Sequence, residues 1–367
     1  RSSVRDSSFK RSVSIGVHET GMLTSAPPDC MKRAAPSRTP GELALIEAIR
    51  HQAARVPGSA SLRLGIGDDC AILRPTPGYE ICVTTDFTLE DVHFRRDWHP
   101  PESVGHRCLA RGLSDLAAMG ARPIAVFLSI ALPPRLPPGW LDRFLHGFLE
   151  LAARYQAPLA GGDTAASASG TIAADIVAIG EVPAGRALLR SGARPGDTLY
   201  VTGSLGGAAA ELAQLSRNPR RFRSLTPGSP DHPHLCPEPR VSVGRRLRSL
   251  AHAAIDVSDG LSTDLTHLCQ ESGVSAVLEE GLLPIHPLAS ESPDPLQLAL
   301  HGGEDYELLF TAGPRQRIPH SIAGVPTRRI GTIRKSQSRQ PLIVMNTGKG
   351  RSVPIAAAGW QHFAPSR

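Results

Sequence analysis

Apolar side chains recur along the chain with two different spacings, and these spacings predict an alternation of helices and strands. Spacing of about one helical turn predicts helices over residues 42–53, 101–119, 140–155, 206–215 and 261–269. Short apolar runs that stop at glycine or polar residues predict strands over residues 79–85, 125–132, 171–181, 199–202, 253–257 and 304–310. Because the two kinds of element alternate in both halves, we expect a mixed α/β (α+β) protein.

Residues at the ends of these elements support the assignments. Helix 101–119 begins at Pro101 and is followed by Gly120, the usual order of proline and glycine at helix ends. The sequence Gly-Gly-Asp-Thr at residues 161–164 predicts a turn. In helix 42–53, the side chains expected to face the core are Leu43, Ile46, Ile49 and Ala53.

A length of 367 residues exceeds that of a usual single domain and favours two domains. We expect an N-terminal α/β domain over residues 41–185 and a C-terminal α/β domain over residues 186–367. Residues 1–40 are rich in serine and arginine, as transit peptides are, but they also contain acidic residues. We therefore expect them to form a flexible extension that precedes the folded protein.

The net charge of +6 is concentrated in two segments. Residues 1–40 carry a net charge of +4 and the Pro/Arg-rich insert at residues 215–240 carries +3, so the rest of the chain is near −1. Segments of this composition are typical of disorder, and we expect both to be disordered. Because the folded part then has no basic face, we expect no nucleic-acid binding.

The six cysteines show neither a C-x-x-C pair nor the spacing of a zinc site with histidine. Cys82, Cys108 and Cys269 lie in apolar segments and are expected to be small core residues of a reducing compartment. No apolar stretch approaches the roughly 20 residues that span a bilayer. We therefore expect a soluble, cytoplasmic protein that does not bind membranes.

Six aspartates stand where apolar runs or helices give way to glycine, serine or threonine. A buried carboxylate costs several kcal/mol unless it is paired. Six of them in apolar, glycine-rich surroundings require compensating positive charge, and magnesium ions that bridge ATP phosphates would supply it. The six are Asp69, Asp86, Asp115, Asp163, Asp256 and Asp259.

Each candidate residue also has a structural interpretation. Aspartate is common in turns, and Asp115 could form only a surface ion pair with Arg111, one helical turn before it. Glu304 could serve a turn, His93 could be a hydrogen-bonded structural residue, and Trp360 could anchor a core. Because six aspartates share one sequence context, we favour metal binding for the group as a whole.

The two common glycine-rich nucleotide motifs are missing from the sequence. It contains no G-x-x-x-x-G-K-[ST], and no G-x-G-x-x-G that opens a helix after a strand. Phosphate binding would then depend on metal ions and scattered donors. Ser258 and the amides that follow it, at the start of helix 261–269, are suited to a helix N-terminus that faces a phosphate.

Nine segments occur in an order that resembles the bacterial thiamine-monophosphate kinase family. They are GELALI, GIGDDCA, TTDFTLEDVHF, LSDLAAMGARP, GGDT, RALLRSGARPGD, AIDVSDGLSTDL, GGEDYEL and GWQHF. These segments run from Gly41 to Phe363 and leave out the N-terminal extension and the insert. Each segment is modest alone, but their joint order is highly specific.

The resemblance implies a two-domain fold of the aminoimidazole-ribonucleotide synthetase-like superfamily, with the N-terminal sheet paired across a homodimer. It implies a kinase that uses ATP and several Mg²⁺ ions to phosphorylate thiamine monophosphate to thiamine diphosphate, the last step of thiamine diphosphate biosynthesis. Direct in-line transfer without a covalent protein nucleophile is then expected, because the acceptor phosphate is already an anion.

Matched motif by motif, the resemblance implies three groups of ligand-binding residues. The expected magnesium ligands are Asp69, Thr84, Thr85, Asp86, Asp115, Asp163, Asp256 and Asp259. The expected ATP contacts are Tyr155, Gly162, Asp163, Arg190 and Ser258. The expected contacts to thiamine monophosphate are His93, Glu304 and Trp360, with the indole stacked on a thiamine ring.

Two positions depart from the family's sequence. Asp91 stands where relatives often have glycine, and Ala165 and Ala166 follow GGDT where polar or basic residues are frequent. Neither change removes an expected ligand. Two other functions stay open: an enzyme of the same fold that acts on another small acceptor with ATP, and a catalytically silent nucleotide-binding scaffold.

Overall fold

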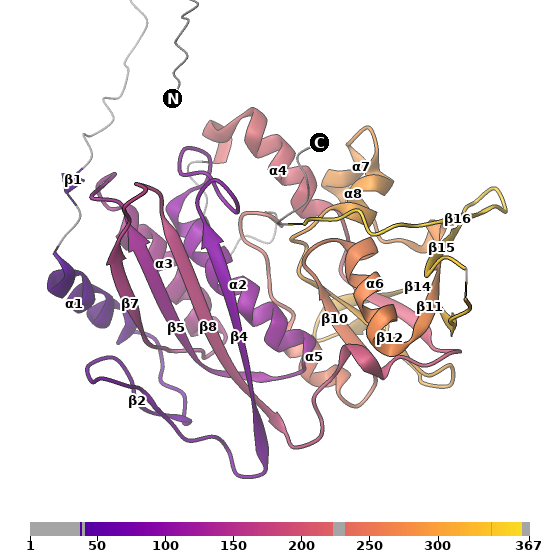
Figure 1. The fold of residues 1–367 in the computed structure, drawn as a ribbon, viewed down its shortest axis with the longest axis horizontal. Coiled ribbons are helices and arrows are strands. Elements are labelled where there is room, and N and C mark those ends of the chain that lie inside the picture. Colours follow the sequence, from indigo (N-terminus) through magenta and orange to yellow (C-terminus); the bar gives the residue numbers. More distant parts are fainter. Residues whose placement is uncertain (1–36, 39–40, 223–231, 339, 362–367) are drawn as a thin grey trace, which may run out of the picture. The chain divides into compact units, whose positions relative to one another are not determined.

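A four-stranded sheet forms the centre of the N-terminal half in the computed structural model, which describes residues 37–38, 41–222, 232–338 and 340–361 (Figure 1). The strand order is β4-β8-β5-β7; β5 and β7 are parallel, and the other neighbouring pairs are antiparallel. The strands are β4 (Tyr79–Leu89), β8 (Ala173–Pro183), β5 (Arg122–Leu132) and β7 (Leu159–Ala166). Two short pairs accompany them: β1 (Ser37–Arg38) with β6 (Arg135–Leu136), and β2 (Leu62–Leu64) with β3 (Ile72–Leu73).

Helices α2 (Pro101–Ala118) and α3 (Trp140–Arg154) lie behind this sheet in the view of Figure 1. They cross closely because small residues face each other. A Cβ atom on Gly105 would lie 1.9 Å from the carbonyl oxygen of Phe144, and one on Gly147 would lie 2.0 Å from that of Glu102. Only glycine permits this approach. The crossing therefore fixes the position of α2 against α3.

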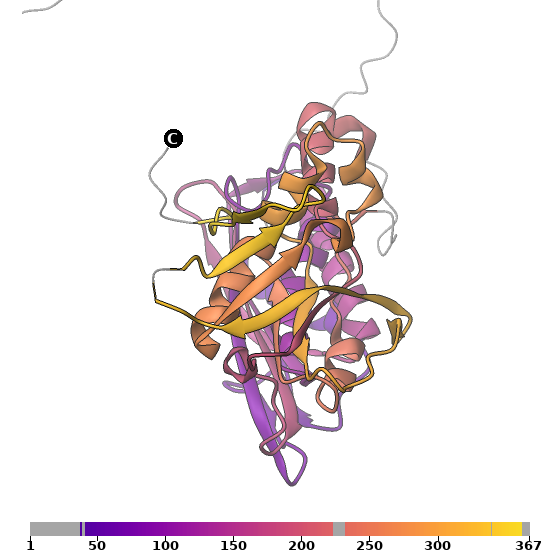
Figure 2. The same cartoon turned by 90° about the vertical axis from the view of Figure 1, so that its right-hand side faces the viewer.

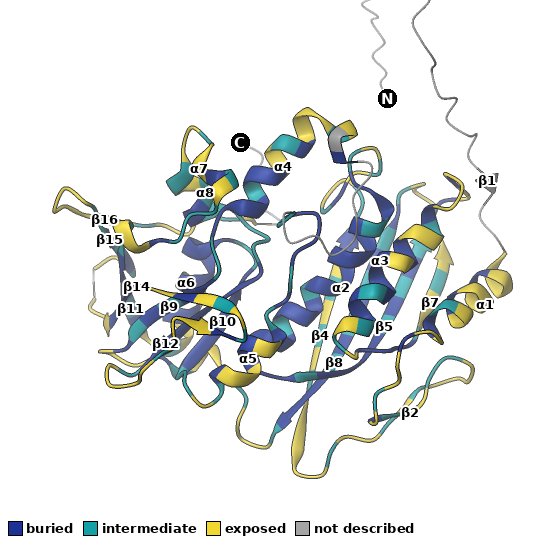
Figure 3. Cartoon of the chain, turned by 180° about the vertical axis from the view of Figure 1, so that it is seen from behind, coloured by how far each residue is buried: buried dark blue, intermediate teal, exposed yellow. Residues whose placement is uncertain are grey.

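The opposite face of the sheet is open and partly apolar. Side chains along β4 alternate between the two faces, as in any strand, so every second one points away from α2. Among these, Ile81, Val83 and Phe87 are exposed, with Phe87 at 61%. Figure 3 shows that most of α2 is buried, whereas β4 has many exposed positions.

An eight-stranded mixed sheet forms the C-terminal half (Figure 2). Its order is β10-β12-β9-β14-β11-β15-β16, with β13 paired to β14. The strands are β9 (Thr198–Thr202), β10 (Ala253–Val257), β11 (Val274–Glu279), β12 (Glu307–Ala312), β13 (Ser321–Ile322), β14 (Val325–Lys335), β15 (Ile343–Asn346) and β16 (Ser352–Pro354). The helices of this half are α4 (Gly207–Arg217), α5 (Val241–Leu247), α6 (Leu261–Ser272), α7 (Pro287–Ser290) and α8 (Pro295–His301).

Helix α2 links the two halves. It packs against β4 and β8 of the first sheet and against α5 and β10 of the second half. The first hydrophobic core accordingly combines Phe144 and Phe148 of α3 with Leu308 and Phe310 of β12. A second core, which includes Leu199 and Ile255, lies wholly within the C-terminal half. The polar residues of α2 are thus held between the two halves.

Helix α1 (Glu42–Ala53) has the predicted bounds, but its buried face differs from the prediction. Leu45, Ile49 and Ala53 are buried, whereas Leu43 is 84% exposed and Ile46 is 38% exposed. The helix packs mainly against β7 and α3, so a narrow stripe at every fourth residue is enough to cover its contact. The prediction that Leu43 and Ile46 face the core was wrong.

Three predicted element boundaries also need correction. Strand β4 continues through Asp86, which pairs with Ile176 of β8, instead of stopping there. Residues 161–164 lie within β7 and pair with β5, so the predicted turn is a strand. Strand β12 begins only at Glu307, and Glu304, with a φ of 67°, belongs to the loop before it.

The predicted disorder of residues 215–240 is wrong for the described part of this insert. Leu215, Phe222, Leu235 and Cys236 form a small buried core against which Trp98 packs. Apolar side chains interspersed among the prolines and arginines supply this core. Residues 223–231, and residues 1–40 apart from β1, lie outside the described residues.

The cysteines within the described residues are free, and Cys108 and Cys269 are buried as predicted, while Cys82 is half-buried. Within that same part of the chain, no helix combines the length and apolar character needed to cross a bilayer.

Candidate active site

Helix α2 presents three polar side chains at intervals of four residues: Arg107, Arg111 and Asp115. This interval places them along one stripe of the helix. Most of α2 is buried, so these polar groups must find partners in the neighbouring elements. Arg107 and Arg111 face Glu304, and Asp115 faces β4 and the end of β10.

Four of the six predicted aspartates form one carboxylate cluster, made of Asp86, Asp115, Asp256 and Asp259. Burial, together with the charges of Asp115, Asp175 and Asp259 and against the opposing effect of Arg111, raises the pKa of Asp86 to about 6. Burial and the neighbouring Asp115 raise the pKa of Asp256 to about 7. Burial is the main cause of both shifts, and the neighbouring carboxylates add to it.

Hydroxyl groups hold two members of the carboxylate cluster. Thr84 of β4 donates a hydrogen bond to Asp115, and Ser114 donates one of 2.7 Å to Asp256. Arg190 lies close enough to lower the pKa of both Asp115 and Asp256. The structure therefore brings Thr84 and Arg190, both predicted as site residues, to this cluster.

The carboxylate cluster suits magnesium in its chemistry. Its donors are hard oxygens, and a divalent cation would offset the repulsion that raises their pKa values. Across the described part of the chain, no three His, Cys, Asp or Glu side chains already converge to hold a metal ion. Magnesium commonly takes one or two carboxylates and completes its shell with water and substrate phosphates, which is consistent with this arrangement.

The structure places Asp69, Asp163 and the side chain of Thr85 apart from the carboxylate cluster. Asp163 is exposed on β7, three strands from β4, which corresponds to about 14 Å. Asp69 is exposed in the loop between β2 and β3, and Gly65 in this loop packs against Ala160 of β7. The exposed side chain of Thr85 points to the sheet face opposite Thr84.

The nucleotide contacts predicted from sequence are also separated. Gly162 lies on β7 beside Asp163, and its backbone approaches Leu128 so closely that a Cβ would clash with it. The hydroxyl of Tyr155 is 2.5 Å from Glu238 and 2.6 Å from the carbonyl oxygen of Pro239. Tyr155 thus anchors the segment before α5.

The turn at residues 258–260 differs from the predicted phosphate-binding helix end. The amides of Ser258, Asp259 and Gly260 all donate to Asp264, at 3.1, 3.1 and 3.0 Å. Burial, followed by the charges of Asp256 and Asp259, raises the pKa of Asp264 to about 8. These amides thus have a partner within the protein, and a phosphate contact at Ser258 stays a prediction.

A cavity of about 350 Å³ adjoins the carboxylate cluster at Asp259. Three aromatic side chains line it, Phe94, Trp98 and Trp360. Its polar lining includes His93, Arg111, Ser258, Asp259 and Glu304. The three residues predicted to contact the acceptor, His93, Glu304 and Trp360, thus lie in one pocket.

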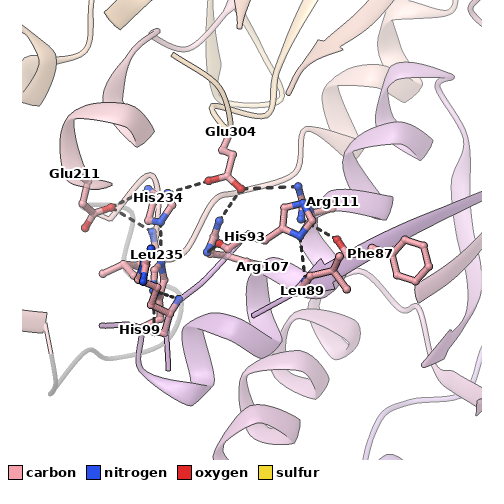
Figure 4. A network of polar contacts seen from close by, with 11 residues as sticks. Phe87, Leu89, His93, His99, Arg107, Arg111, Glu211, His234, Leu235 and Glu304 are labelled. Carbon is pink, nitrogen blue, oxygen red and sulfur yellow. Dashed lines mark hydrogen bonds and ion pairs between the residues drawn. The ribbon is translucent and has the colours of Figure 1, made fainter. Parts of the chain in front are cut away.

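Glu304 of this pocket faces three basic side chains (Figure 4). Its carboxylate lies 2.6 Å from Arg107, 3.1 Å from His234 and 3.9 Å from Arg111. Burial alone would raise the pKa of Glu304, but Arg107 and His234 outweigh it and hold the pKa well below its usual range. The adjacent Asp305 instead caps α4 through the amides of Gly206 and Ala208.

Comparison with known proteins covers both halves of the chain. Residues 67–182 match the family model for the AIR synthase related protein, N-terminal domain, and residues 194–319 match that for the C-terminal domain. Thiamine-monophosphate kinase of Escherichia coli (strain K12) is 38% identical over 313 residues, which are 83% of this chain and 93% of that protein. The chain belongs to the thiamine-monophosphate kinase family.

Solved structures of the thiamine-monophosphate kinase family have the same fold. The crystal structure of thiamine-monophosphate kinase from Stenotrophomonas maltophilia K279a is 36% identical, with a TM-score of 0.73, and the match covers 86% of this chain and 98% of that one. A structure described as AaThiL complexed with AMPPCP and TMP is 28% identical, with a TM-score of 0.68, covering 88% and 97%.

Two pocket residues of this thiamine-monophosphate kinase family member, Arg111 and His234, were not predicted from its sequence, and neither was Arg107, which pairs with Glu304. Arg107 and Arg111 were overlooked, although their spacing of four residues from each other and from Asp115 could have indicated a shared face. His234 was overlooked because it lies in the insert that was predicted to be disordered. The apolar Leu235 and Cys236 beside it were the available signal.

Proposed function

We propose that the protein transfers the γ-phosphoryl group of ATP to the phosphate of thiamine monophosphate, forming thiamine diphosphate and ADP. One observation carries this proposal: an aromatic pocket with a carboxylate shares Asp259 with a cluster of four aspartates. The pocket suits a cationic aromatic acceptor, and the cluster suits the metal-bound phosphates of ATP. Relatives at 36–38% identity that match most of the chain are thiamine-monophosphate kinases.

In this reaction the acceptor supplies its own nucleophile. An oxygen of the thiamine monophosphate phosphate forms a bond to the γ-phosphorus, while the bond from that phosphorus to the β,γ-bridging oxygen breaks. ADP leaves with the electron pair of that bond. Because the attacking oxygen is already anionic, no protein nucleophile and no strong general base are required, and positioning dominates catalysis.

The protein's residues divide between the two reactants. His93, Glu304 and Trp360 hold the thiamine moiety, with the half-exposed indole of Trp360 stacked on a ring and Glu304 offering negative charge to the thiazolium. Asp86, Asp115, Asp256 and Asp259, together with Thr84, face the phosphates. Mg²⁺ bound there would neutralise charge between the two anionic reactants.

The remaining predicted ligands lie in two places: Asp69, Gly162 and Asp163 on or near β7, and Arg190 and Ser258 near the carboxylate cluster. We assign Asp69 and Asp163, with Gly162, to the outer phosphates of the bound nucleotide, and Arg190 and Ser258 to its contacts near the carboxylate cluster. Exposed carboxylates at a strand edge are accessible to hydrated cations, which supports this assignment for Asp69 and Asp163. We also propose that the backbone of Thr85 is a magnesium ligand and that the ring of Tyr155 contacts ATP, as predicted from the sequence.

We further propose that two copies form a homodimer through the open face of the first sheet. Ile81, Val83 and Phe87 of β4 present an apolar row on that face, and such rows are rare on monomeric surfaces unless they bind a partner. Pairing with the same face of a second copy would bury this row symmetrically. We place the enzyme in the cytoplasm, in accordance with its free cysteines.

The direct test is incubation with ATP, Mg²⁺ and thiamine monophosphate, followed by chromatography for thiamine diphosphate. Formation of thiamine diphosphate and ADP in equal amounts is the expected result. ATP consumption with only a different small acceptor would instead support a same-fold enzyme of other specificity. Binding of ATP without any product from the folded protein would support a silent scaffold and overturn the proposal.

A further inference from the structure

The aromatic pocket that we propose binds thiamine monophosphate is called the acceptor pocket from here on. Arg111 lies between this pocket and the carboxylate cluster. Its side chain lines the pocket together with Glu304 and Asp259. On its other side it lies close enough to Asp86 and Asp115 to lower the pKa of both carboxyl groups. The two anionic reactants of the proposed reaction would meet at this point.

One hydrogen bond holds the guanidinium of Arg111 in place, but this bond does not use all of its N–H donors. Nη1 donates a hydrogen bond of 2.9 Å to the carbonyl oxygen of Phe87, and Nη2 lies 3.9 Å from Glu304, beyond hydrogen-bond distance. Arginine has five N–H donors. Among the described residues only the Phe87 carbonyl takes a hydrogen bond from this side chain, and the side chain keeps 15% exposure. Donors therefore remain for a ligand in the pocket.

Arg107, one helical turn earlier, provides a contrast. Its side chain is 4% exposed and donates to both Glu304, at 2.6 Å, and the carbonyl oxygen of His93, at 3.0 Å. Arg107 is thus a structural partner of pocket residues. Because Arg107 already pairs with Glu304, Arg111 is not needed to compensate that carboxylate (Figure 4).

We propose that Arg111 is a catalytic residue that binds the acceptor phosphate and the phosphoryl group in transfer. This inference rests on the proposed function. A guanidinium presents parallel N–H groups that match phosphate oxygens and stays charged at any working pH. While the acceptor oxygen bonds to the γ-phosphorus and ADP departs, Arg111 keeps the two anions together and stabilises charge on the equatorial oxygens.

Binding of thiamine monophosphate and of thiamine separates a phosphate contact from a structural role. The two ligands differ only in the phosphate, so a residue that binds this group affects one and not the other. In calorimetry without ATP, Arg111→Met should weaken binding of thiamine monophosphate by about 10-fold or more, since hydrogen bonds to charged groups are worth about 1.5–3 kcal/mol. Affinity for thiamine should stay unchanged.

Steady-state kinetics provide the second measurement. Arg111→Met should lower kcat by about 100-fold or more, as expected for loss of a preorganised donor in the transition state. Arg111→Lys keeps the charge without the planar fork and should recover only part of kcat. The matched control is Arg143→Met, which removes an ion-paired arginine on α3 that contacts Glu102 and does not line the pocket.

These experiments distinguish a failure of the role of Arg111 from a failure of the proposed function. Equal weakening of both ligands, or a folded Arg111→Met enzyme with nearly normal kcat, would overturn the role of Arg111 even if the wild type makes thiamine diphosphate. If the wild type makes no product but only its thiamine monophosphate affinity depends on Arg111, the proposed function fails while the phosphate contact stands. Thermal unfolding of each variant shows whether the fold is intact.

Discussion

The Nδ1 atom of His234 lies 3.1 Å from a carboxylate oxygen of Glu304. The other ring nitrogen of His234 is 3.0 Å from Nε2 of His99, whose Nδ1 accepts the amide N–H of Arg95 at 3.1 Å. With both rings neutral, His99 donates to His234, and the remaining proton of His234 lies on Nδ1, the nitrogen nearest Glu304. The insert, which had no predicted role, thereby holds a pocket residue in place.

Replacing His234 by alanine should weaken acceptor binding. Glu304 keeps Arg107 but loses the contact that fixes its second oxygen, so its carboxylate gains freedom. We expect the KM for thiamine monophosphate to rise by about 10-fold, the effect of one lost polar contact to a charged group, with a smaller change in the KM for ATP. His232→Ala is the control, because His232 contacts Glu211 and not Glu304. Equal changes in both KM values would contradict this role.

His99 should make the protein less stable as the pH falls below 6.5. The pKa of His99 is lowered to about 2, mainly by burial and then by the charges of Arg107 and His234. Glu304 and the carbonyl of Arg95 oppose this shift. The unfolded chain then binds a proton that the folded protein does not, and the free energy of unfolding falls by up to about 1.4 kcal/mol per pH unit from this group.

Urea unfolding of wild type and His99→Gln between pH 7.5 and 5 measures this contribution. The variant should lose this slope, and the comparison cancels the groups common to both proteins. Parallel stability curves for the two proteins would show that His99 is protonated as easily in the fold as in the unfolded chain.

Asp86→Asn and Asp115→Asn should each lower turnover by orders of magnitude without unfolding the protein. Each change removes a carboxylate from a crowded cluster, so stability without metal should hold or rise. Addition of Mg²⁺ and ATP should raise the Tm of the wild type more than that of either variant. Asp142→Asn on the exposed side of α3 is the matched control. Nearly normal turnover by a folded Asp86→Asn protein would count strongly against the assignment.

Trp360→Ala should raise the KM for thiamine monophosphate more than the KM for ATP. The indole lines the acceptor pocket and is 51% exposed, so its loss costs little stability but removes a stacking surface. Steady-state kinetics with each substrate varied in turn give the comparison. If only the KM for ATP changes, the proposed stacking of Trp360 on the acceptor is wrong.

Val83→Glu should convert the proposed homodimer to a monomer. Val83 is 60% exposed in the apolar row of β4, and a charge buried there on pairing would be uncompensated. Leu43→Glu, at an exposed apolar position on α1, should leave the assembly unchanged. Sedimentation velocity of the wild type and both variants decides the point. A dimer that survives Val83→Glu would place the interface elsewhere.

Much of the fold followed from local signals in the sequence. The ends of α1 and β10 were predicted to the residue, and those of α2 and α3 nearly so, because helix periodicity and terminal proline or glycine are short-range features. Strand extent was harder to predict. Asp86 and Gly162 looked like turn residues, but ladder pairing with β8 and β5 keeps them in strands.

The candidate site was predicted in its chemistry but not in its spatial grouping. Sequence order cannot show that Asp163 lies at the sheet edge opposite Asp86, since strand order depends on tertiary packing. Nor could it show that Asp264 would occupy the amides of residues 258–260. The residues around Glu304 come from α2 and the insert, and only the fold unites them.

The interval of four residues between Arg107, Arg111 and Asp115 fixes the spacing of these three side chains along α2. Each interval corresponds to a rise of about 6 Å, so under the proposed function the helix would set the distance between the ring of thiamine monophosphate and the phosphates of ATP. The glycine crossing with α3 prevents α2 from sliding to suit a longer or shorter acceptor. Inserting one residue after Arg107 would turn the later side chains by about 100° and move Arg111 away from the pocket and Asp115 away from Thr84 and Asp256.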